Sequence, residues 1–451
     1  MKMRSYVGMI GLVLVSTVAA CSDDKKEMVT PPPPAAVTYW QDVAPVMQQR
    51  CVSCHQAGGI GPFRMDDYQE AKAHAALIAG AVKTRTMPPW LAQGDGACGD
   101  FKGSNWLTAQ EIELFSKWAD SGAAEGTART DLHPPALGTL DANGEVSSPE
   151  FRPMAKGDQT AHADDYRCFI VDPKLDSVQY MTGYEVLPGT PAMIHHVLLM
   201  QLDPEKKAMD GRTNAEIIAA LHETDSARDG WPCYGLAGEG TSISGIPVTW
   251  APGMGVVHLP PGVGVPLSPR ALLVMQVHYN LANSGLQGRS DVTKVRLELQ
   301  PTVERPGFFD NKDRLLESLF TKMPATLEGG KSNVEYTFDF DYDDLMKGLG
   351  TPTLDIFGVF PHMHGYGRTQ RVQVIRAGAS QCAVQVPAWN FNWQLYYFYN
   401  QPMQLAPGDK VRVTCGYDTT TSGGPVVLPG WGTSNEMCLL GLFLVPPKAP
   451  Q

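Results

Sequence analysis

The sequence is poor in charged residues and contains no basic cluster. Charged side chains make up 18% of its 451 residues, and the formal net charge is −11. Domains that bind nucleic acids carry basic patches or stripes, so this composition argues against a nucleic acid as the partner. With 45 glycines and 36 prolines, the chain favours short strands and turns over long helical bundles.

The N-terminal apolar run is too short to cross a membrane and remain there. It extends from Val7 to Val15 after basic Lys2 and Arg4, whereas a transmembrane helix needs about 20 apolar residues. This pattern predicts a secretory signal. The ending Val18-Ala19-Ala20-Cys21 resembles the bacterial lipobox, in which the signal is removed before a cysteine that is then lipid-modified. An ordinary signal followed by a fortuitous cysteine is the alternative.

A lipid-anchored envelope protein is therefore expected. Residues 1–21 would form the lipoprotein signal with its Cys21, and residues 22–37 a tether stiffened by Pro31–Pro34. The lipid on Cys21 would hold the protein at a bacterial membrane, facing the periplasm or the exterior. Export also implies an oxidising compartment, in which disulfides persist.

Residues 38–128 are predicted to form a small all-α domain that carries haem. The segment Cys51-Val52-Ser53-Cys54-His55 has the spacing of covalent haem attachment, with two thioether bonds and His55 as an iron ligand. A zinc knuckle or a disulfide is the alternative, but the second ligand pair that zinc requires is missing at close spacing. Helices are expected at residues 39–50, 67–83 and 108–119, and the last two begin with capping-box spacing.

Three helices around this attachment site resemble a small class I cytochrome c. In that family a methionine is the distal iron ligand, and Met87 in Thr86-Met87-Pro88-Pro89-Trp90 stands at the corresponding place. A methionine ligand would raise the reduction potential of the haem. His74 is the alternative distal ligand, although its helix face with Ala71 and Ile78 is typical of a packed histidine.

Beyond a Pro-, Gly- and Asp-rich linker at residues 129–150, the sequence predicts β structure. Short β-rich runs between Gly or Pro turns indicate sandwiches, and about 300 residues favour two of them. We expect these sandwiches at residues 151–301 and 302–448, which makes the chain mainly β. The expected strands are 165–171, 197–202, 272–281, 294–299, 334–340, 354–360, 371–375, 410–414 and 438–445.

Candidate metal ligands occur in a fixed order in this β-rich region: His195, His196, His278, His362, His364 and Met437. Two histidines two residues apart on a strand share a face, so His362 and His364 form a ligand pair. His278 alternates with an apolar stripe and points away from it. The doublet His195-His196 needs a strand end or a bulge to bind one ion. Divided three and three, these ligands suggest two mononuclear sites.

Four motifs in this order resemble the copper type II, ascorbate-dependent monooxygenases, which include peptidylglycine α-hydroxylating monooxygenase and dopamine β-hydroxylase. They are Ile194-His195-His196-Val197, Leu273-Val274-Met275-Gln276-Val277-His278-Tyr279, His362-Met363-His364 and Thr433-Ser434-Asn435-Glu436-Met437-Cys438. The resemblance extends over about Phe151 to Val445. It implies two tandem jelly-roll sandwiches, each with one copper ion, that face each other across a cleft.

The resemblance also implies roles for individual residues. His195, His196 and His278 would hold the electron-transfer copper, and His362, His364 and Met437 the oxygen-activating copper. Disulfides Cys168–Cys233 and Cys415–Cys438 are implied as well. Cys98 and Cys382 stay unassigned, although a bridge between them would tie the haem domain to the second sandwich.

Ligand softness agrees with this division. Two imidazoles and a thioether suit Cu(I), whereas an all-imidazole site tolerates both oxidation states. Met363 faces the opposite side of its strand, which makes Met437 the better thioether, with core packing as its alternative role. Peptide-amidating members grip a carboxylate with a basic residue and a tyrosine where this chain has Phe360 and Gly441. A less charged or aromatic small molecule is therefore the expected substrate.

The sequence thus predicts an exported monooxygenase that hydroxylates a C–H bond with O2. Electrons would come from ascorbate or an envelope donor, and the haem held by Cys51, Cys54, His55 and Met87 would pass them to the three-histidine copper. Because the haem domain and the copper domains are on one chain, the haem meets the copper site intramolecularly, at an effective concentration in roughly the millimolar range. Two domains that are merely fused are the alternative. A non-catalytic haem and copper protein of the envelope is the alternative function.

Overall fold

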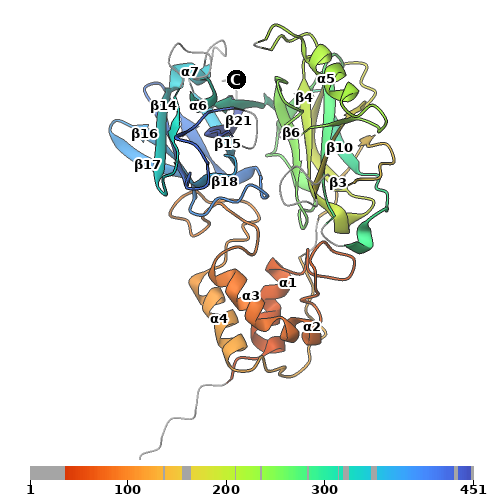
Figure 1. Ribbon diagram of the computed structural model, residues 1–451, viewed down its shortest axis with the longest axis vertical. Helices are drawn as coiled ribbons and strands as arrows, with labels where there is room; N and C mark the ends of the chain where they lie inside the picture. Colours follow the sequence, from red (N-terminus) through yellow and green to blue (C-terminus); the bar gives the residue numbers. More distant parts are fainter. Residues whose placement is uncertain are drawn as a thin grey trace, which may run out of the picture. The chain divides into compact units, whose positions relative to one another are not determined.

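The computed structural model describes residues 36–135, 138–154, 164–208, 210–233, 236–281, 284–312, 314–317, 325–346, 353–430 and 435–447. The expected lipobox with Cys21 and the proline tether lie outside these ranges. Residues 37–451 form one compact unit, in which a helical region precedes two β-rich bodies (Figure 1). The mainly β class predicted from the sequence is confirmed.

The N-terminal region is helical, as predicted. Its elements are η1 (Tyr39–Val43), α1 (Ala44–Arg50), α2 (Tyr68–Ala73), α3 (Ala75–Lys83) and α4 (Ala109–Asp120). The segment expected as one helix at residues 67–83 is divided at His74, whose φ and ψ of −110° and 11° are not helical. Thr108 and Glu111 form the complete capping box at the start of α4. Large side chains from η1, α1 and α4, including Tyr39, Met47 and Trp118, fill the core.

Two sheets packed around one hydrophobic core form the first sandwich. One sheet has the order β1 (Gly144–Ser147), β10 (Lys294–Gln300), β3 (Gln179–Leu187), β8 (Val263–Leu267), β11 (Arg305–Pro306), with β7 (Val257–His258) beside β3. The other has the order β5 (Trp231–Pro232), β2 (Asp164–Val171), β9 (Leu272–Asn280), β4 (Ile194–Leu202), β6 (Gly245–Trp250). The pairings between described strands are antiparallel except for that of β11 with β8.

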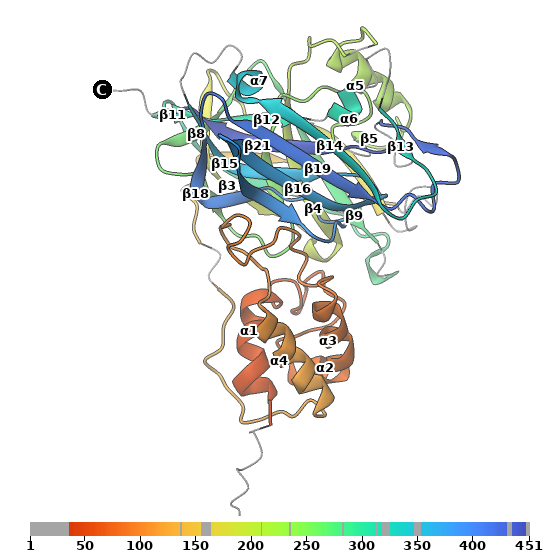
Figure 2. The ribbon, with the colours of Figure 1, turned by 90° about the vertical axis from the view of Figure 1, so that its left-hand side faces the viewer.

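The second sandwich encloses a second core and is also built from antiparallel sheets (Figure 2). One sheet has the order β12 (Phe308–Lys312), β21 (Leu439–Val445), β15 (Leu354–His362), β18 (Tyr397–Leu405). The other has the order β14 (Val334–Asp341), β19 (Lys410–Tyr417), β16 (Gly367–Arg376), β17 (Ala379–Val386). A further small pair joins β13 (Leu327–Glu328) to β20 (Val426–Val427).

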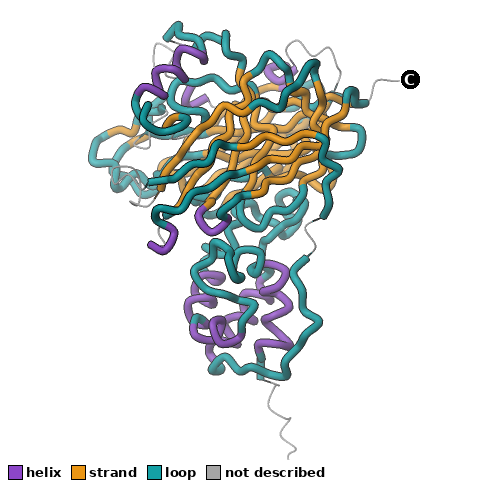
Figure 3. The backbone as a smooth tube through the Cα atoms, turned by 90° about the vertical axis from the view of Figure 1, so that its right-hand side faces the viewer, coloured by secondary structure: helices purple, strands orange, loops and turns teal. Residues whose placement is uncertain are grey.

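Each strand expected from the sequence is present, but several others were missed. β6 and β18 each contain a proline and lie at the edge of their sheets, where a missing backbone N–H costs no ladder hydrogen bond. β3, β8 and β17 were also missed, together with α5 (Asn214–Glu223). Figure 3 shows how strand dominates the region after the N-terminal helices.

The segment after Met87 joins the helical region to the second sandwich. Leu91 and Phe101 belong to the core of that sandwich, and Lys102 N–H donates to Phe398 O at 2.8 Å. A disulfide links Cys98 to Cys382, the pair that the sequence left unassigned. This part of the chain therefore packs as an extension of the second sandwich.

The two disulfides implied by the family resemblance are present as well. Cys168 is bonded to Cys233, and Cys415 to Cys438. Three disulfides indicate an oxidising, extracytoplasmic location. Among the residues that the structure describes, no helix is both long and apolar enough to span a membrane.

Candidate functional site

A buried three-histidine cluster, His195, His196 and His278, lies on two neighbouring strands of the first sandwich. β4 starts at Ile194, directly after the 3-10 turn Pro191–Met193, and its pairing with β9 shifts register between Ile194 and His196. This bulge at a strand start lets both members of the doublet contribute to one site. His278 on β9 lies directly opposite His196.

The Nδ1 atoms of the three-histidine cluster converge. Nδ1 of His196 is 3.4 Å from Nδ1 of His195 and 3.3 Å from Nδ1 of His278. Two imidazole nitrogens that share one ion at about 2.0 Å, with tetrahedral to trigonal angles, lie about 3.3–3.5 Å apart. The cluster therefore has the spacing of a metal site and could hold one copper ion.

A hydrogen bond sets the tautomer of His196 in this cluster. Nε2 of His196 lies 3.1 Å from Gln276 Oε1, and Gln276 Nε2 donates to Cys233 O at 3.0 Å, which fixes the orientation of the amide. His196 must then carry its proton on Nε2 and its lone pair on Nδ1. Nε2 of His278 lies 3.2 Å from Asp164 Oδ1, but outside good hydrogen-bond geometry. Such partners commonly orient histidine ligands around a metal.

Burial keeps these imidazoles neutral. Desolvation lowers the pKa of His196 to about 4. It also lowers the pKa values of His195 and His278 well below their usual range, and the neighbouring histidines contribute further. At neutral pH the three rings therefore offer lone pairs rather than N–H⁺ groups, as metal binding requires.

The second ligand set, His362, His364 and Met437, lies where β15 meets β21. His362 ends β15 and pairs with Leu439, so the continued antiparallel register would place His364 opposite Met437. The rings of His362 and His364 are 5.3 Å apart and perpendicular. The Met437 side chain is 2% exposed. Sequence-distant residues are thus gathered at one end of a strand pair.

Hydrogen bonds favour the opposite tautomer at the second ligand set. Nδ1 of His362 donates to Gln394 Oε1 at 2.8 Å, because Gln394 Nε2 is itself the donor to Phe391 O. Nδ1 of His364 donates to Asn435 O at 3.1 Å. Each ring, in its neutral form, therefore carries its lone pair on Nε2. Burial lowers the pKa of His362 to about 3, so that ring is also neutral at physiological pH.

Glu436 connects the segment that carries His364 to the segment that carries Met437 by hydrogen bonds. Its carboxylate accepts backbone N–H bonds from His364 at 2.9 Å, Tyr366 at 2.7 Å and Met437 at 3.2 Å. The side chain is fully buried, and burial raises its pKa to about 7 against the effect of these donors. Glu436 is adjacent to the proposed ligand Met437, yet its positioning role was not foreseen from the sequence.

One segment of the second sandwich, residues 389–394, contacts both sets of candidate ligands; we call it the bridging segment. Trp389 Nε1–H donates to His364 O at 3.1 Å. Gln394 holds His362, and the neighbouring Trp393 packs on His195 with ring centroids 4.5 Å apart. Gln394 carries no signal in the sequence that marks it as a partner of His362, and no sequence pattern pairs Trp393 with His195.

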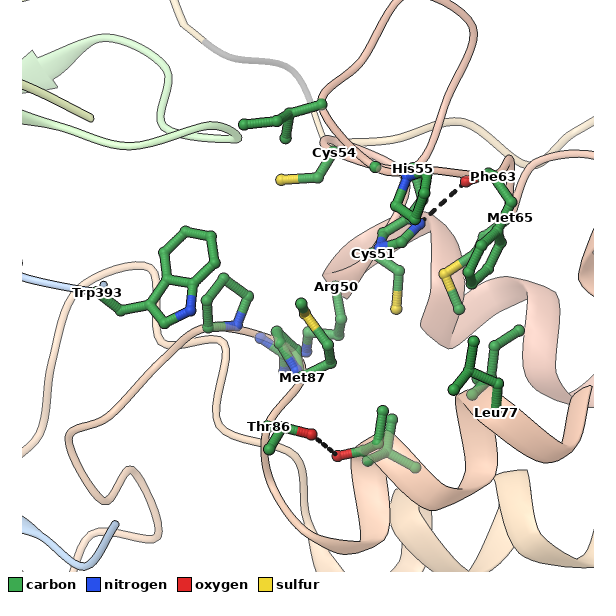
Figure 4. A pocket seen from close by; sticks show the side chains of 18 of the residues that line it. Arg50, Cys51, Cys54, His55, Phe63, Met65, Leu77, Thr86, Met87 and Trp393 are labelled. Atoms are coloured by element: carbon green, nitrogen blue, oxygen red, sulfur yellow. Dashed lines mark hydrogen bonds between the residues drawn. The ribbon is translucent and has the colours of Figure 1, made fainter. Parts of the chain in front are cut away.

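A 470 Å³ cavity lies beside the C-x-x-C-H motif; we call it the Cys51 cavity. Cys51, Cys54, His55 and Met87 line it together with apolar side chains from α3 and the Ile60–Phe63 loop. Both cysteines are free thiols. Figure 4 shows Trp393 across the cavity from Met65 and Leu77.

The Cys51 cavity has donors suited to haem. Nδ1 of His55 donates to Phe63 O at 3.0 Å, because a carbonyl can only accept, and the lone pair is then on Nε2. Burial lowers the pKa of His55, which keeps that lone pair available at neutral pH. Cavities that hold cofactors are typically about 300–1,000 Å³ and mostly apolar. The rival distal residue, His74, stacks on Phe63, and its Nδ1 donates to Glu70 O at 2.8 Å.

Comparisons with known proteins find similarity to one family. Residues 329–445, which include the second ligand set, match the model described as copper type II ascorbate-dependent monooxygenase, C-terminal domain. This part of the chain is therefore similar to the C-terminal domain of that family. It is 25% identical over 264 residues to "DBH-like monooxygenase protein 1" of Gallus gallus, covering 56% of this chain and 39% of that protein.

Two further proteins with monooxygenase or hydroxylase names are similar to this chain. The chain is 26% identical over 230 residues to "Putative DBH-like monooxygenase protein 2" of Homo sapiens, covering 48% of this chain and 42% of that protein. It is 22% identical over 292 residues to "Tyramine beta-hydroxylase" of Caenorhabditis briggsae, covering 62% of this chain and 45% of that protein. The chain thus spans 39% to 45% of the length of these relatives.

The two positions at which the sequence departs from the peptide-amidating pattern are close together in the structure. Phe360 on β15 pairs with Gly441 on β21. A Cβ added at Gly441 would lie 2.9 Å from Asn311 Oδ1 and from Phe360 Cβ, and 3.0 Å from the Tyr396 hydroxyl. A tyrosine at this position would therefore need its surroundings to move.

Proposed function

We propose that this protein is a copper-dependent monooxygenase that hydroxylates a C–H bond of a small organic substrate with O2. The observation that carries the proposal is the convergence of three neutral, buried imidazoles in the first sandwich of a chain whose residues 329–445 match a copper monooxygenase family. Bound copper would supply one-electron redox chemistry and the reduction of O2. Two jelly-roll domains, one for each copper, are part of this proposal.

The three-histidine cluster is proposed as the electron-transfer site. Its three nitrogen ligands and their buried, hydrogen-bonded surroundings suit both oxidation states of copper. Gln276 orients His196, and Asp164 lies beside His278. These partners would hold the ligand geometry constant while the charge of the bound ion changes.

The second ligand set is proposed as the oxygen-activating site. The thioether of Met437 favours Cu(I), and Glu436 ties the backbone of Met437 to that of His364. Gln394 and Asn435 O hold the rings of His362 and His364, respectively, so that their Nε2 atoms carry the lone pairs. His364 is buried, and the ring centroid of Phe391 in the bridging segment lies 6.0 Å from that of His364; limited access of water would protect reactive species from side reactions.

The substrate is proposed to be a small molecule without the carboxylate that amidating enzymes recognise. Phe360 is fully buried beside Tyr396, with ring centroids 5.1 Å apart. Neither Phe360 nor Gly441 carries a positive charge that could bind a carboxylate. An apolar or aromatic substrate therefore agrees better with this wall than an anionic one.

The Cys51 cavity is proposed to hold a covalent haem c. Cys51 and Cys54 would form the thioether bonds, His55 would be the proximal ligand, and Met87 the distal one. The haem would receive electrons from ascorbate or a donor of the cell envelope, where lipidation at Cys21 would retain the protein. Covalent attachment on the same chain keeps this donor beside the copper sites.

Metal analysis and isotope labelling test the function. Purified protein, matured with haem and reconstituted with copper, should contain two copper ions and one iron per chain. Turnover of a panel of small aromatic and aliphatic substrates under 18O2 should place one labelled oxygen in the product. If the protein binds copper and haem but yields no labelled product with any substrate, the alternative function, electron transfer, is favoured. If it binds no copper, both functions are contradicted.

A further inference from the structure

The Cys51 cavity and the three-histidine cluster share a wall. His195, Asn280 and Trp393 line this cavity together with Cys51, Cys54, His55 and Met87. His195 is thus both a member of the cluster and a boundary of the cavity.

Trp393 completes this wall from the second sandwich. Its indole packs on the His195 ring at a centroid distance of 4.5 Å and an interplanar angle of 36°. A turn in which Trp393 N–H donates to Asn390 O at 3.0 Å sets its backbone. Figure 4 shows the indole directed toward the cavity that Met87 also borders. The ring therefore borders both the cavity and a candidate copper ligand.

Asn280 provides a second contact between the cavity and the cluster. Its amide Nδ2 donates to Asp164 Oδ1 at 3.0 Å, and the same oxygen lies 3.2 Å from His278 Nε2. Asn280, Asp164 and His278 thus form a chain of polar contacts from the cavity wall to the cluster.

We propose that His195 and Trp393 form the port through which electrons pass from the haem to the three-histidine copper. This inference rests on the proposed function, because it requires both cofactors. In each transfer, ferrous haem becomes ferric and Cu(II) becomes Cu(I). Two transfers, together with two protons, one O2 and one C–H bond, yield one C–OH group and one water. A one-electron donor such as ascorbate re-reduces the haem.

Trp393 acts in this scheme as a positioning residue, since it holds His195 against the cavity and fills the space beside it. Replacement by a smaller aliphatic side chain would admit water beside His195 and remove the aromatic contact on its ring. Both changes weaken the electronic contact between haem and copper, while the ligands of each cofactor stay in place. The transfer rate should therefore change more than the properties of either cofactor.

The test measures intramolecular electron transfer in the full-length holoprotein without O2 or substrate. Haem is reduced by a flash-activated donor while copper is Cu(II), and oxidation of the ferrous band follows the transfer. Trp393→Leu should slow this rate at least about tenfold, which corresponds to about 1.4 kcal/mol in the barrier. Trp393→Phe, which retains an aromatic ring, should restore most of the rate. Trp40→Leu is the matched control, because Trp40 packs in the helical core and does not line the cavity.

Cofactor readouts separate the outcomes. The haem potential, the Cu(II) electron paramagnetic resonance spectrum and the copper content should be the same in Trp393→Leu and in the unmodified protein. If Trp393→Leu transfers electrons as fast as the unmodified protein, the proposed role of His195 and Trp393 as the port is wrong, but the proposed function is not contradicted. A haem in the unmodified protein that cannot reduce the copper, although ascorbate drives hydroxylation, would overturn the port too. Failure to bind copper would contradict the proposed function itself.

Discussion

The indole of Trp393 packs against the imidazole of His195, with ring centroids 4.5 Å apart. The next residue, Gln394, accepts a hydrogen bond from His362. Two adjacent residues of one segment therefore contact both sets of candidate copper ligands. This relationship links the two proposed sites mechanically, since a movement of the bridging segment changes the surroundings of both.

Replacing the proposed thioether ligand should separate the two copper sites. Met437→Ile keeps a buried aliphatic side chain but removes the soft sulfur donor. We expect hydroxylation to fall at least about a hundredfold, a larger effect than is typical for loss of an outer partner, while the three-histidine copper stays reducible. Product assays and copper content measure both effects. Met363→Ile is the control, and normal turnover in Met437→Ile would assign Met437 to packing.

Removing the Glu436 carboxylate should destabilise the second ligand set. Glu436→Ala leaves buried backbone N–H groups of His364, Tyr366 and Met437 without their acceptor. Each unsatisfied buried group costs about 1–3 kcal/mol, so the free energy of unfolding should fall by at least about 3 kcal/mol. Urea unfolding measures the change. Glu436→Gln, which keeps one acceptor oxygen, should be intermediate; equal stability of all three proteins would contradict this connecting role.

The copper-free protein should lose stability in acid through its buried histidines. The pKa of His196 is about 4 in the folded protein and about 6.5 in the unfolded chain, so only the unfolded chain binds its proton between these values. The free energy of unfolding should therefore decrease as pH falls from 6.5 to 4. At about 1.4 kcal/mol per pKa unit, His196 alone contributes about 3 kcal/mol.

Urea unfolding at several pH values checks this slope. His196→Asn should flatten it, because the substituted side chain does not titrate. Copper should raise stability most near neutral pH, since protons compete for the same lone pairs. A copper-free protein whose stability is constant from pH 6.5 to 4 would contradict the neutral, buried state of His196.

The disulfide between Cys98 and Cys382 should hold the segment after Met87 on the second sandwich. It closes a loop across a sequence separation of 284 residues, and removal of a disulfide typically costs about 2–4 kcal/mol. Cys98→Ser paired with Cys382→Ser should lower the thermal midpoint and expose residues 93–102 to limited proteolysis. The pair Cys168→Ser and Cys233→Ser, in the first sandwich, is the comparison. Protection of residues 93–102 in both double variants would contradict this tethering role.

The sequence by itself determined the chemistry of the ligands and much of the local structure. C-x-x-C-H, the histidine doublet and His-x-His are short patterns whose residue types decide what they can bind, so they need no tertiary information. The capping box at Thr108 is local for the same reason, and it is present. The bulge that the doublet requires also follows from the two-residue repeat of a strand.

Only the tertiary structure decided which residues surround these patterns. Gln394 meets His362 and Trp393 meets His195 through folding of segments that are 32 and 198 residues apart in sequence. The sequence also did not predict the pairing of Cys98 with Cys382 or the break in the helix at His74. Contacts of this kind depend on strand register and on the packing of one domain against another. A side chain in a loop has no periodicity that reveals its partner, and only the folded chain brings the two together.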